Sequence, residues 1–446
     1  MKNLFLIPIF LLVFYSCSPD EETQVPTNTV QTTTPEPEPD TIQTDTDGDG
    51  VVEYFRYDDD GSFNDQFGWG VAIDGNWAAC GTLGVSGKPG KVFVYSFSND
   101  TWSQTQVINS PNSGYADAFG HRVSISGNYM VVGAYGTRSV GAVYAYEFDA
   151  SLGKWTFTGE LVIPIDIDEY TDSDGNTINP KFGVDLSINS SRDVAVGAYY
   201  YGTTAHPKQG AVVMYSIASS GMNSIRTIYS PDSNTRQSNF GISVAIDDNG
   251  TLVVGAYTET DPIINMGNVF VYSNAGETLI GSLSPTDANP SYTYVGNKNS
   301  DGFGHGVAVD GNYIAVGAVW ENYQQGAVYI YEKTSQAGTH SVSFVQKLVP
   351  DSANNSFFGR RVGISVDILT SAAWKHNDGE VYVYVNSGES HGFVKQHVLE
   401  QATRSGQGDA LGHGIDIDGH NIIAGAYYHT IGQNDKQGSI SIFRLP

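Results

Sequence analysis

The sequence predicts an all-β protein, a seven-bladed β-propeller of four-stranded antiparallel blades in which an N-terminal strand closes the last blade. Three observations predict this fold. One stretch recurs seven times, each recurring unit holds four strand-like runs, and the two ends of the chain are incomplete in complementary ways. Units of this size cannot bury their apolar faces alone and must pack on one another, which a closed ring achieves for all of them.

The recurring stretch begins with an aromatic-glycine pair or its near equivalent, passes through a turn and ends in a run rich in Val, Ala and Gly. Successive copies start 52, 63, 58, 63, 55 and 53 residues apart. The copies are FGWGVAIDGNWAACGT from Phe67, FGHRVSISGNYMVVGAY from Phe119, FGVDLSINSSRDVAVGAY from Phe182, FGISVAIDDNGTLVVGAY from Phe240, FGHGVAVDGNYIAVGAV from Phe303, FGRRVGISVDILTSAAW from Phe358 and LGHGIDIDGHNIIAGAY from Leu411.

Each unit holds four runs that read as strands. The first alternates, with Val71 and Ile73 as apolar positions, and the second is nearly all apolar, as in residues 129–134. The third is led by glycine and rich in Tyr and Val (141–146), and the fourth often carries Trp and a later aliphatic residue (155–163). Gly and Asn in the connecting turns tolerate the positive φ of tight hairpins. The runs therefore predict four-stranded antiparallel sheets in series.

The ends of the chain predict how the propeller closes. The seventh unit stops after its third strand, residues 439–443, and a strand-like run at 51–57 precedes the first unit without a unit of its own. We expect the N-terminal run to supply the outer strand of the last blade, which would cover its free edge.

These repeats resemble FG-GAP repeats, which build the propellers of integrin α-chains and of many bacterial surface proteins. The resemblance covers roughly residues 51–446. It implies the propeller fold and leaves the ligand open, because one fold hosts many functions. Integrin-type blades carry a DxDxDGxxD calcium loop between their first and second strands, whereas this chain has only DGN, SGN, NSS, DDNG, DGN, SVD or DGH there. Calcium within the blades is therefore not predicted.

Residues 1–16 resemble a lipoprotein signal peptide, with Lys2, an apolar stretch at 4–15 and then Cys17. The apolar stretch is short for a membrane span. We expect cleavage before Cys17 and lipidation of its thiol; the alternative is an ordinary secretory signal with an incidental cysteine. The acidic run 20–22 resembles the export signal of surface lipoproteins of the Bacteroidota type, which implies a lipid-anchored protein of the outer membrane, exposed at the cell surface. A periplasm-facing anchor is the alternative.

Residues 17–50 hold the lipidated Cys17 and a linker rich in Thr, Pro, Asp and Glu with hardly an aliphatic residue. Such a segment cannot offset the entropy of ordering by burying apolar surface, so we expect it to be disordered. Residues 51–446 then form the propeller domain.

The composition excludes one class of partner. The formal net charge is −26 although only 16% of residues are charged, so the acidity reflects a shortage of Lys and Arg. This field repels nucleic acid and anionic membrane surfaces, and the predicted contact with the membrane is through the lipid anchor only. Of the two cysteines, Cys80 falls in a second strand and is expected to be a small buried apolar residue, so no disulfide framework is predicted.

One acidic segment is a candidate calcium site. Asp45, Asp47 and Asp49 alternate before Gly50, Val51 offers a carbonyl and Glu53 a further carboxylate. Oxygen ligands at alternate positions and a glycine for a sharp turn suit a hard cation, and the segment resembles calcium loops of the thrombospondin type 3 or integrin kind. Ca²⁺ is the one cofactor that the sequence suggests. An EF-hand would need an acid where Arg56 stands, and a solvated acidic linker is the alternative.

A set of aromatic residues directly follows the second strands and is a candidate ligand-binding surface. In a propeller this loop shares one face with the start of the first strand. Tyr and Trp offer flat apolar surface with a polar edge, which suits a sugar or an extracellular or envelope protein. The favoured interpretation, however, is that these rings seal contacts between blades. The set is Tyr135, Tyr199, Tyr257, Trp320, Trp374 and Tyr427.

Two further sets recur around the Phe-Gly pairs. The residue after each pair is expected near the axis, where three histidines could hold a transition metal, although hydrogen-bonded structural histidines are the favoured interpretation. These residues are Trp69, His121, Val184, Ile242, His305, Arg360 and His413. Four aspartates precede the pairs by two residues and are expected to cap the turn that begins the first strand. They are Asp65, Asp117, Asp301 and Asp409.

No catalytic motif such as HExxH or GxSxG occurs, and the glycines belong to the repeats. We therefore predict no enzyme, and a lipid-anchored surface propeller that binds a glycan or protein ligand in adhesion. The alternatives are a scaffold subunit of an envelope complex and a polysaccharide-processing enzyme whose site is spread over several blades.

Overall fold

The computed structural model describes residues 42–43, 49–84, 88–112, 117–172, 174–218, 221–231, 238–257, 267–285, 301–336, 339–351, 355–388, 392–406 and 408–446. All of them belong to one compact unit, Pro37–Pro446. The predicted signal peptide, the lipidation site Cys17 and most of the predicted linker lie outside the described residues. No helix among the described residues is long and apolar enough to cross a membrane.

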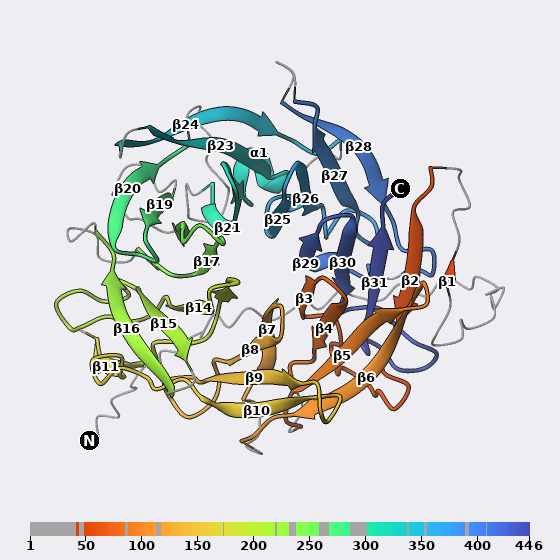
Figure 1. Cartoon of the computed structure of the whole chain (residues 1–446), viewed down its shortest axis with the longest axis horizontal. Helices are drawn as coiled ribbons and strands as arrows, with labels where there is room; N and C mark the ends of the chain where they lie inside the picture. The colour runs from red at the N-terminus through yellow and green to blue at the C-terminus, as the bar shows by residue number, and fades with distance from the viewer. Residues whose placement is uncertain are drawn as a thin grey trace, which may run out of the picture. The chain divides into compact units, whose positions relative to one another are not determined.

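The described strands form seven four-stranded antiparallel blades, which follow one another around a common centre (Figure 1). Blade 1 holds β3 (Gly70–Asp74), β4 (Trp77–Gly81), β5 (Lys91–Ser98) and β6 (Thr101–Asn109). Blade 2 holds β7 (Phe119–Ser126), β8 (Tyr129–Ala134), β9 (Val143–Asp149) and β10 (Lys154–Glu160). Blade 3 holds β13 (Leu186–Ile188), β14 (Asp193–Ala198), β15 (Ala211–Ala218) and β16 (Gly221–Tyr229). Blade 4 holds β17 (Ser243–Ile246), β18 (Leu252–Ala256), β19 (Asn268–Ser273) and β20 (Thr278–Leu283).

The remaining blades repeat this order. Blade 5 holds β21 (Phe303–Asp310), β22 (Tyr313–Ala318), β23 (Ala327–Gln336) and β24 (Thr339–Leu348). Blade 6 holds β25 (Val362–Ser365), β26 (Ile368–Ala372), β27 (Val381–Asn386) and β28 (Phe393–Leu399). Blade 7 holds β29 (Leu411–Asp418), β30 (Asn421–Ala426), β31 (Ser439–Arg444) and β2 (Val52–Arg56). Outside the blades, β11 (Tyr170–Thr171) pairs with β12 (Thr177–Ile178), and a single turn, α1 (Glu321–Gln324), follows β22.

The closure predicted from the chain ends is confirmed. Strand β2 pairs antiparallel with β31, with a register from Val52↔Arg444 to Arg56↔Ile440. Tyr54 and Phe55 on β2 are 3% and 1% exposed, so the closing strand is held by packing as well as by the ladder. The two-residue strand β1 (Ile42–Gln43) pairs along the outer edge of β2.

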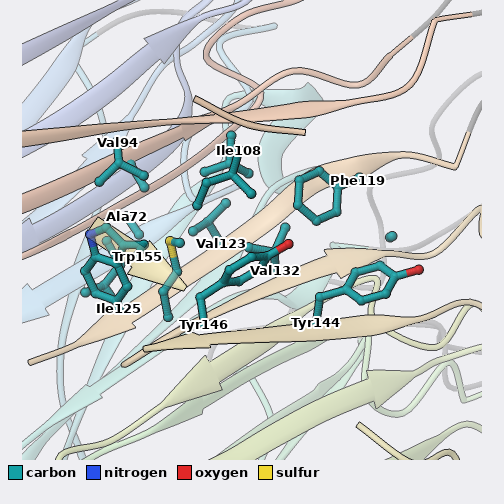
Figure 2. Packing of buried hydrophobic residues seen from close by; sticks show 14 of the residues in the cluster. Ala72, Val94, Ile108, Phe119, Val123, Ile125, Val132, Tyr144, Tyr146 and Trp155 are labelled. Atoms are coloured by element: carbon teal, nitrogen blue, oxygen red, sulfur yellow. The ribbon is translucent and has the colours of Figure 1, made fainter. Parts of the chain in front are cut away.

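The innermost strands complete the circle. Each first strand contacts the first strand of the next blade, and β29 of blade 7 contacts β3 of blade 1. The core lies between blades, where side chains of two facing sheets interdigitate. Figure 2 shows one such layer, in which Ala72 and Val94 of blade 1 meet Val123 and Ile125 of blade 2. Burying side chains of this kind contributes about 1.5–3 kcal/mol each for the larger ones.

The repeated Phe-Gly pair is explained by the contact between blades. The side chains of the six phenylalanines and of Leu411 are fully buried, and the glycine after each has φ between 84° and 94°, which other residues rarely adopt. The glycine near the end of each second strand faces the Phe-Gly turn of the next blade. A Cβ on Gly317 would lie 1.7 Å from the carbonyl oxygen of Gly359 in the next blade. The two glycines therefore let adjacent blades approach closely. In blade 6, Ala372 replaces the glycine near the end of the second strand.

Two structural predictions from the sequence are confirmed. Cys80 is fully buried, accepts a hydrogen bond from the Gly68 N–H at 3.1 Å, and burial raises the pKa of its thiol. Asp117 caps its turn by accepting from the Phe119 N–H at 3.0 Å. Asp409 and Asp65 accept instead from the preceding loop, from the backbone N–H groups of Ser405 at 2.8 Å and Ser62 at 2.7 Å, so the predicted cap is confirmed for Asp117.

Candidate functional site

One face of the propeller carries the seven Phe-Gly or Leu-Gly turns together with the loops that follow the second strands, and we call it the Phe-Gly face. The two features share a face because the first and second strands of a blade are antiparallel, so the start of one lies beside the end of the other. Isolated bridges between Phe182 and Gly141, and between Phe240 and Gly210, join adjacent blades at this level.

The six aromatic residues predicted as a ligand surface all lie on the Phe-Gly face, and most pack on rings from the neighbouring first strands. The ring centroid of Tyr135 lies 4.6 Å from that of His121, and the ring centroid of Tyr257 lies 5.4 Å from that of His305. The ring of Tyr199 lies 4.0 Å from that of Tyr200, with the two planes tilted by 38°. Burial, with the neighbouring phenols as a further cause, raises the pKa of Tyr199.

The aromatic contacts are densest where blades 6, 7 and 1 meet. The ring of Tyr427 lies 4.2 Å from His413 and 4.7 Å from Trp69, and the ring of Trp374 lies 5.2 Å from His413. Trp69 comes from the blade whose second strand is followed by Leu83 instead of an aromatic residue. Trp374 and Tyr427 are 8% and 4% exposed, whereas the other four predicted residues are half-buried. Trp374 and Tyr427 therefore pack mainly against other blades, and the rest keep surface for a ligand.

The three histidines after the Phe-Gly turns are neutral at pH 7. Burial first, and then nearby arginines, lower the pKa of His121 and His413 well below the usual value and that of His305 to about 3. Arg360 Nη1 lies 2.8 Å from His413 Nε2, and His305 Nδ1 lies 3.3 Å from the Arg360 carbonyl oxygen. Within the described parts of the chain, no three His, Cys, Asp or Glu side chains are grouped so as to hold a metal ion.

Two arginines and one aspartate, which the sequence analysis did not single out, meet at the axis. Arg122 of blade 2 forms an ion pair with Asp185 of blade 3 through its Nε atom. Arg361 of blade 6 reaches the same carboxylate from another direction, with 4.0 Å between its Nη1 and Oδ1. The other carboxylate oxygen of Asp185 accepts from the Val244 N–H at 2.9 Å. Burial, and then the neighbouring Arg122, lower the pKa of Arg361.

These charged groups line an axial cavity of about 160 Å³ whose wall includes residues from the first strands of all seven blades. Further along it lies Asp416 of β29, whose oxygens accept from the backbone N–H groups of Ile73 and Ile417 at 3.0 Å each. Burial nevertheless raises the pKa of Asp416 to about 7. The cavity therefore has arginines near the Phe-Gly face and a carboxyl group beyond them.

A signal for this charged centre is present in the sequence. The position two residues after each Phe-Gly pair is Gly70, Gly306 or Gly414 in three blades and Ser243 in a fourth, but Arg122, Asp185 and Arg361 occupy it in the others. The predicted set around the Phe-Gly pairs contains only the residue one position earlier, so it does not include these three.

The candidate calcium segment is described only in part, because Asp45 and Asp47 lie outside the described residues. Asp49 accepts from the Val51 N–H at 2.9 Å, and its second oxygen lies 2.9 Å from His397 Nδ1. Glu53 is buried in blade 7, where it accepts from Ser441 Oγ and from the Ala402 N–H, and burial raises its pKa. The Glu53 carboxylate thus already has partners inside the blade, and calcium binding here stays a prediction.

Comparison with known proteins identifies the repeats. The FG-GAP repeat family matches residues 57–95, 102–146, 227–272 and 296–331. These ranges contain the first two strands of blades 1, 2, 4 and 5 and the beginning of the third strand of each. The chain therefore carries FG-GAP repeats in four places, as its sequence predicts. No curated protein matches the chain.

Two solved structures are similar to this chain. A candidate 6-phosphogluconolactonase from Bacteroides uniformis is 11% identical, with 80% of this chain and 95% of that chain covered and a TM-score of 0.50. Sqt1 from Chaetomium thermophilum is 15% identical, with 85% of this chain and 87% of that chain covered and a TM-score of 0.43. At 11% identity, the likeness to the first of these structures concerns the fold alone.

Proposed function

We propose that this chain, a seven-bladed propeller with FG-GAP repeats, is a lipid-anchored protein of the outer membrane whose Phe-Gly face binds a glycan at the cell surface without chemically changing it. One observation carries this proposal. Aromatic side chains from all seven blades gather on that face around an axial cavity lined by arginines. Binding sites usually combine apolar and aromatic walls with a few convergent polar groups.

Aromatic rings of this kind suit sugars, whose faces carry C–H groups and whose edges carry hydroxyls. Lysines beside the rings add hydrogen-bond donors, because several ammonium groups lie above aromatic residues of this face. These pairs are Lys181 with Tyr135 at 5.1 Å, Lys208 with Tyr200 at 4.7 Å, Lys375 with Phe357 at 4.8 Å and Lys436 with Tyr428 at 5.0 Å.

The state of the histidines supports binding rather than acid-base catalysis. An efficient catalytic group has a pKa close to the working pH. The pKa of His305 lies near 3, and those of His121 and His413 are also strongly lowered, so these imidazoles are weak bases at neutral pH. Their packing against Trp69, Tyr135 and Trp320 suits a rigid recognition surface.

The test is an array of glycans and extracellular proteins probed with the purified full-length chain in detergent. Tyr135→Ala and Trp320→Ala, both at half-buried positions, are expected to weaken binding at least tenfold. Phe157→Ala is the matched control, because this residue is 53% exposed on the outer strand of blade 2. Equal loss in all three variants, or capture of a protein and no glycan, would refute the glycan assignment. Co-purification with an envelope complex would favour the scaffold alternative, and release of shortened sugars would favour the enzyme.

A further inference from the structure

Where the Phe-Gly face meets the propeller axis, the side chains offer more hydrogen-bond donors than acceptors. Arg122 and Arg361 share the single carboxylate of Asp185, and the 4.0 Å separation from Arg361 exceeds hydrogen-bonding distance. Within the described residues, no other carboxylate forms an ion pair with either guanidinium. Since a buried charge is costly unless paired, a second anion would complete this arrangement.

Two neutral side chains beside this centre also lack an acceptor. Arginine only donates, so the Arg360 contact requires His413 Nε2 to accept, which places the ring proton of the neutral imidazole on Nδ1. His413 Nδ1 and Trp374 Nε1 are buried and have no hydrogen-bond partner among the described residues, and the two rings lie 5.2 Å apart. Both unsatisfied atoms are therefore donors, which call for an oxygen acceptor.

The cavity has a size that suits a small charged substituent. Its volume is about 160 Å³, and a cavity of roughly 150 Å³ accommodates a benzene-sized molecule. A planar carboxylate matches the planar guanidinium group, which binds it through parallel N–H···O bonds. Beside this centre the half-buried Trp69 lies 4.4 Å from His413 and 5.9 Å from His121, and it provides aromatic surface for the ring that carries this substituent.

We propose that this centre binds the carboxylate of a uronic acid unit, so that the ligand of the Phe-Gly face is an acidic polysaccharide. This inference rests on the proposed glycan-binding function and names the substrate class. The net charge of −26 opposes the approach of such a polymer at low ionic strength. At physiological salt the Debye length is about 8 Å, so distant acidic groups are screened while the arginine contact persists.

The experiment measures calorimetric binding of the full-length chain to tetragalacturonate and to its fully methyl-esterified form, which removes the charge and keeps the sugar. We expect the acid to bind about 10- to 100-fold more tightly than the ester, as for a charge-assisted hydrogen-bond pair. Arg361→Met, which leaves the Arg122–Asp185 pair intact, should abolish this preference. Arg138→Met is the charge-matched control, because Arg138 is exposed and pairs with Glu160.

The possible results separate the two proposals. Equal binding of acid and ester, unchanged in Arg361→Met, would overturn the carboxylate site and leave the glycan-binding function standing. A sulfated tetrasaccharide that binds more tightly than tetragalacturonate would overturn the uronate assignment, and so would preferential binding of polyglutamate. Binding of none of these probes would overturn the inference, whereas the proposed function is judged by the array and the Tyr135 and Trp320 variants. Thermal melting of each variant checks that the loss concerns binding rather than folding.

Discussion

The axial cavity contains two carboxyl groups that we predict respond oppositely to the same substitution. Asp185 is paired with two arginines, whereas Asp416 accepts two backbone hydrogen bonds but has no ion-pair partner among the described residues. Replacing either residue with Asn keeps the side-chain shape and removes the charge. Asp185→Asn should lower the free energy of unfolding, and Asp416→Asn should raise it at pH 8.

Asp185→Asn should lower the free energy of unfolding because Arg122 and Arg361 would lose the carboxylate that balances their charge. The Asp185 side chain is 5% exposed, and those of Arg122 and Arg361 are 14% and 13% exposed, so the pair is largely shielded from water. Removing one partner of a buried ion pair costs about 3–5 kcal/mol. The arginines keep some contact with solvent, which places the expected loss at the lower end, about 3 kcal/mol.

The gain at Asp416 follows from its raised pKa of about 7, compared with about 3.9 in an unfolded chain. The folded state therefore holds this proton more tightly, and the contribution of Asp416 to stability falls as the pH rises from about 4 to about 7 and is constant above that. Each pKa unit corresponds to about 1.4 kcal/mol, so the full penalty is on the order of 4 kcal/mol. Asn loses one acceptor for a backbone N–H, which leaves an expected gain of about 1–3 kcal/mol at pH 8.

Denaturant unfolding of both variants and the parent chain between pH 4.5 and pH 8.5 measures these differences. The stability advantage of Asp416→Asn should grow with pH up to about 7, while Asp185→Asn remains destabilised throughout. The reasoning would be refuted if Asp185→Asn matched the parent within 0.5 kcal/mol, roughly the effect of an ordinary surface substitution. A destabilised Asp416→Asn at pH 8 would equally contradict the assignment of its raised pKa to burial.

Three further predictions concern the propeller itself. Gly317→Ala would place a Cβ 1.7 Å from a carbonyl oxygen of the next blade, and it should lower the free energy of unfolding in urea by about 3 kcal/mol or more. Gly311→Ala is the control, because this glycine has a φ of 55° but lies in open space, and it should cost only about 1–2 kcal/mol. Equal losses in the two variants would contradict the conclusion that Gly317 allows adjacent blades to approach closely. Phe55→Ala in the closing strand should lower the free energy of unfolding by about 3–5 kcal/mol, because this ring is buried. Since β2 pairs with β31, amide hydrogen exchange in β31 should become faster, and unchanged exchange there would argue against closure by packing. The calcium hypothesis for residues 45–53 predicts that a chelator lowers the melting temperature of the parent chain and leaves Asp47→Asn unaffected, and equal shifts would refute it.

Most of the fold was predictable because it depends on local patterns that recur. The Phe-Gly pair requires a buried aromatic side chain and a positive φ, and both requirements are visible in one sequence without knowledge of the neighbours. The closing strand was predictable by counting strands, since blade 7 lacks one and the run at 52–56 has no other place. The aromatic residues after the second strands were also found, but their exposure depends on the adjacent blades, so Trp374 and Tyr427 are buried where Tyr135 is not.

The charged centre could not be assembled from the sequence because its members come from blades that are distant along the chain. Asp185 and Arg361 are separated by three blades in sequence and meet only because the propeller closes. A repeat analysis compares equivalent positions and finds what they share, whereas a binding site at the axis is built from the positions at which the repeats differ.

This difference gives a physical reason for placing the site at the axis. On the blade contacts, glycines such as Gly317 and buried residues such as Phe358 are fixed by close packing, so a substitution there costs stability. At the second position after the Phe-Gly turn, Gly, Ser, Asp and Arg all occur. Arg122, Asp185 and Arg361 line the axial cavity, whereas the Ser243 hydroxyl donates to the Gly304 carbonyl oxygen of the next blade. Four of the seven positions, those of Arg122, Asp185, Gly306 and Arg361, line one small cavity. The residue type there differs from blade to blade while the blades keep one architecture, so the arginine-rich arrangement found here is a feature of this propeller that its fold does not require.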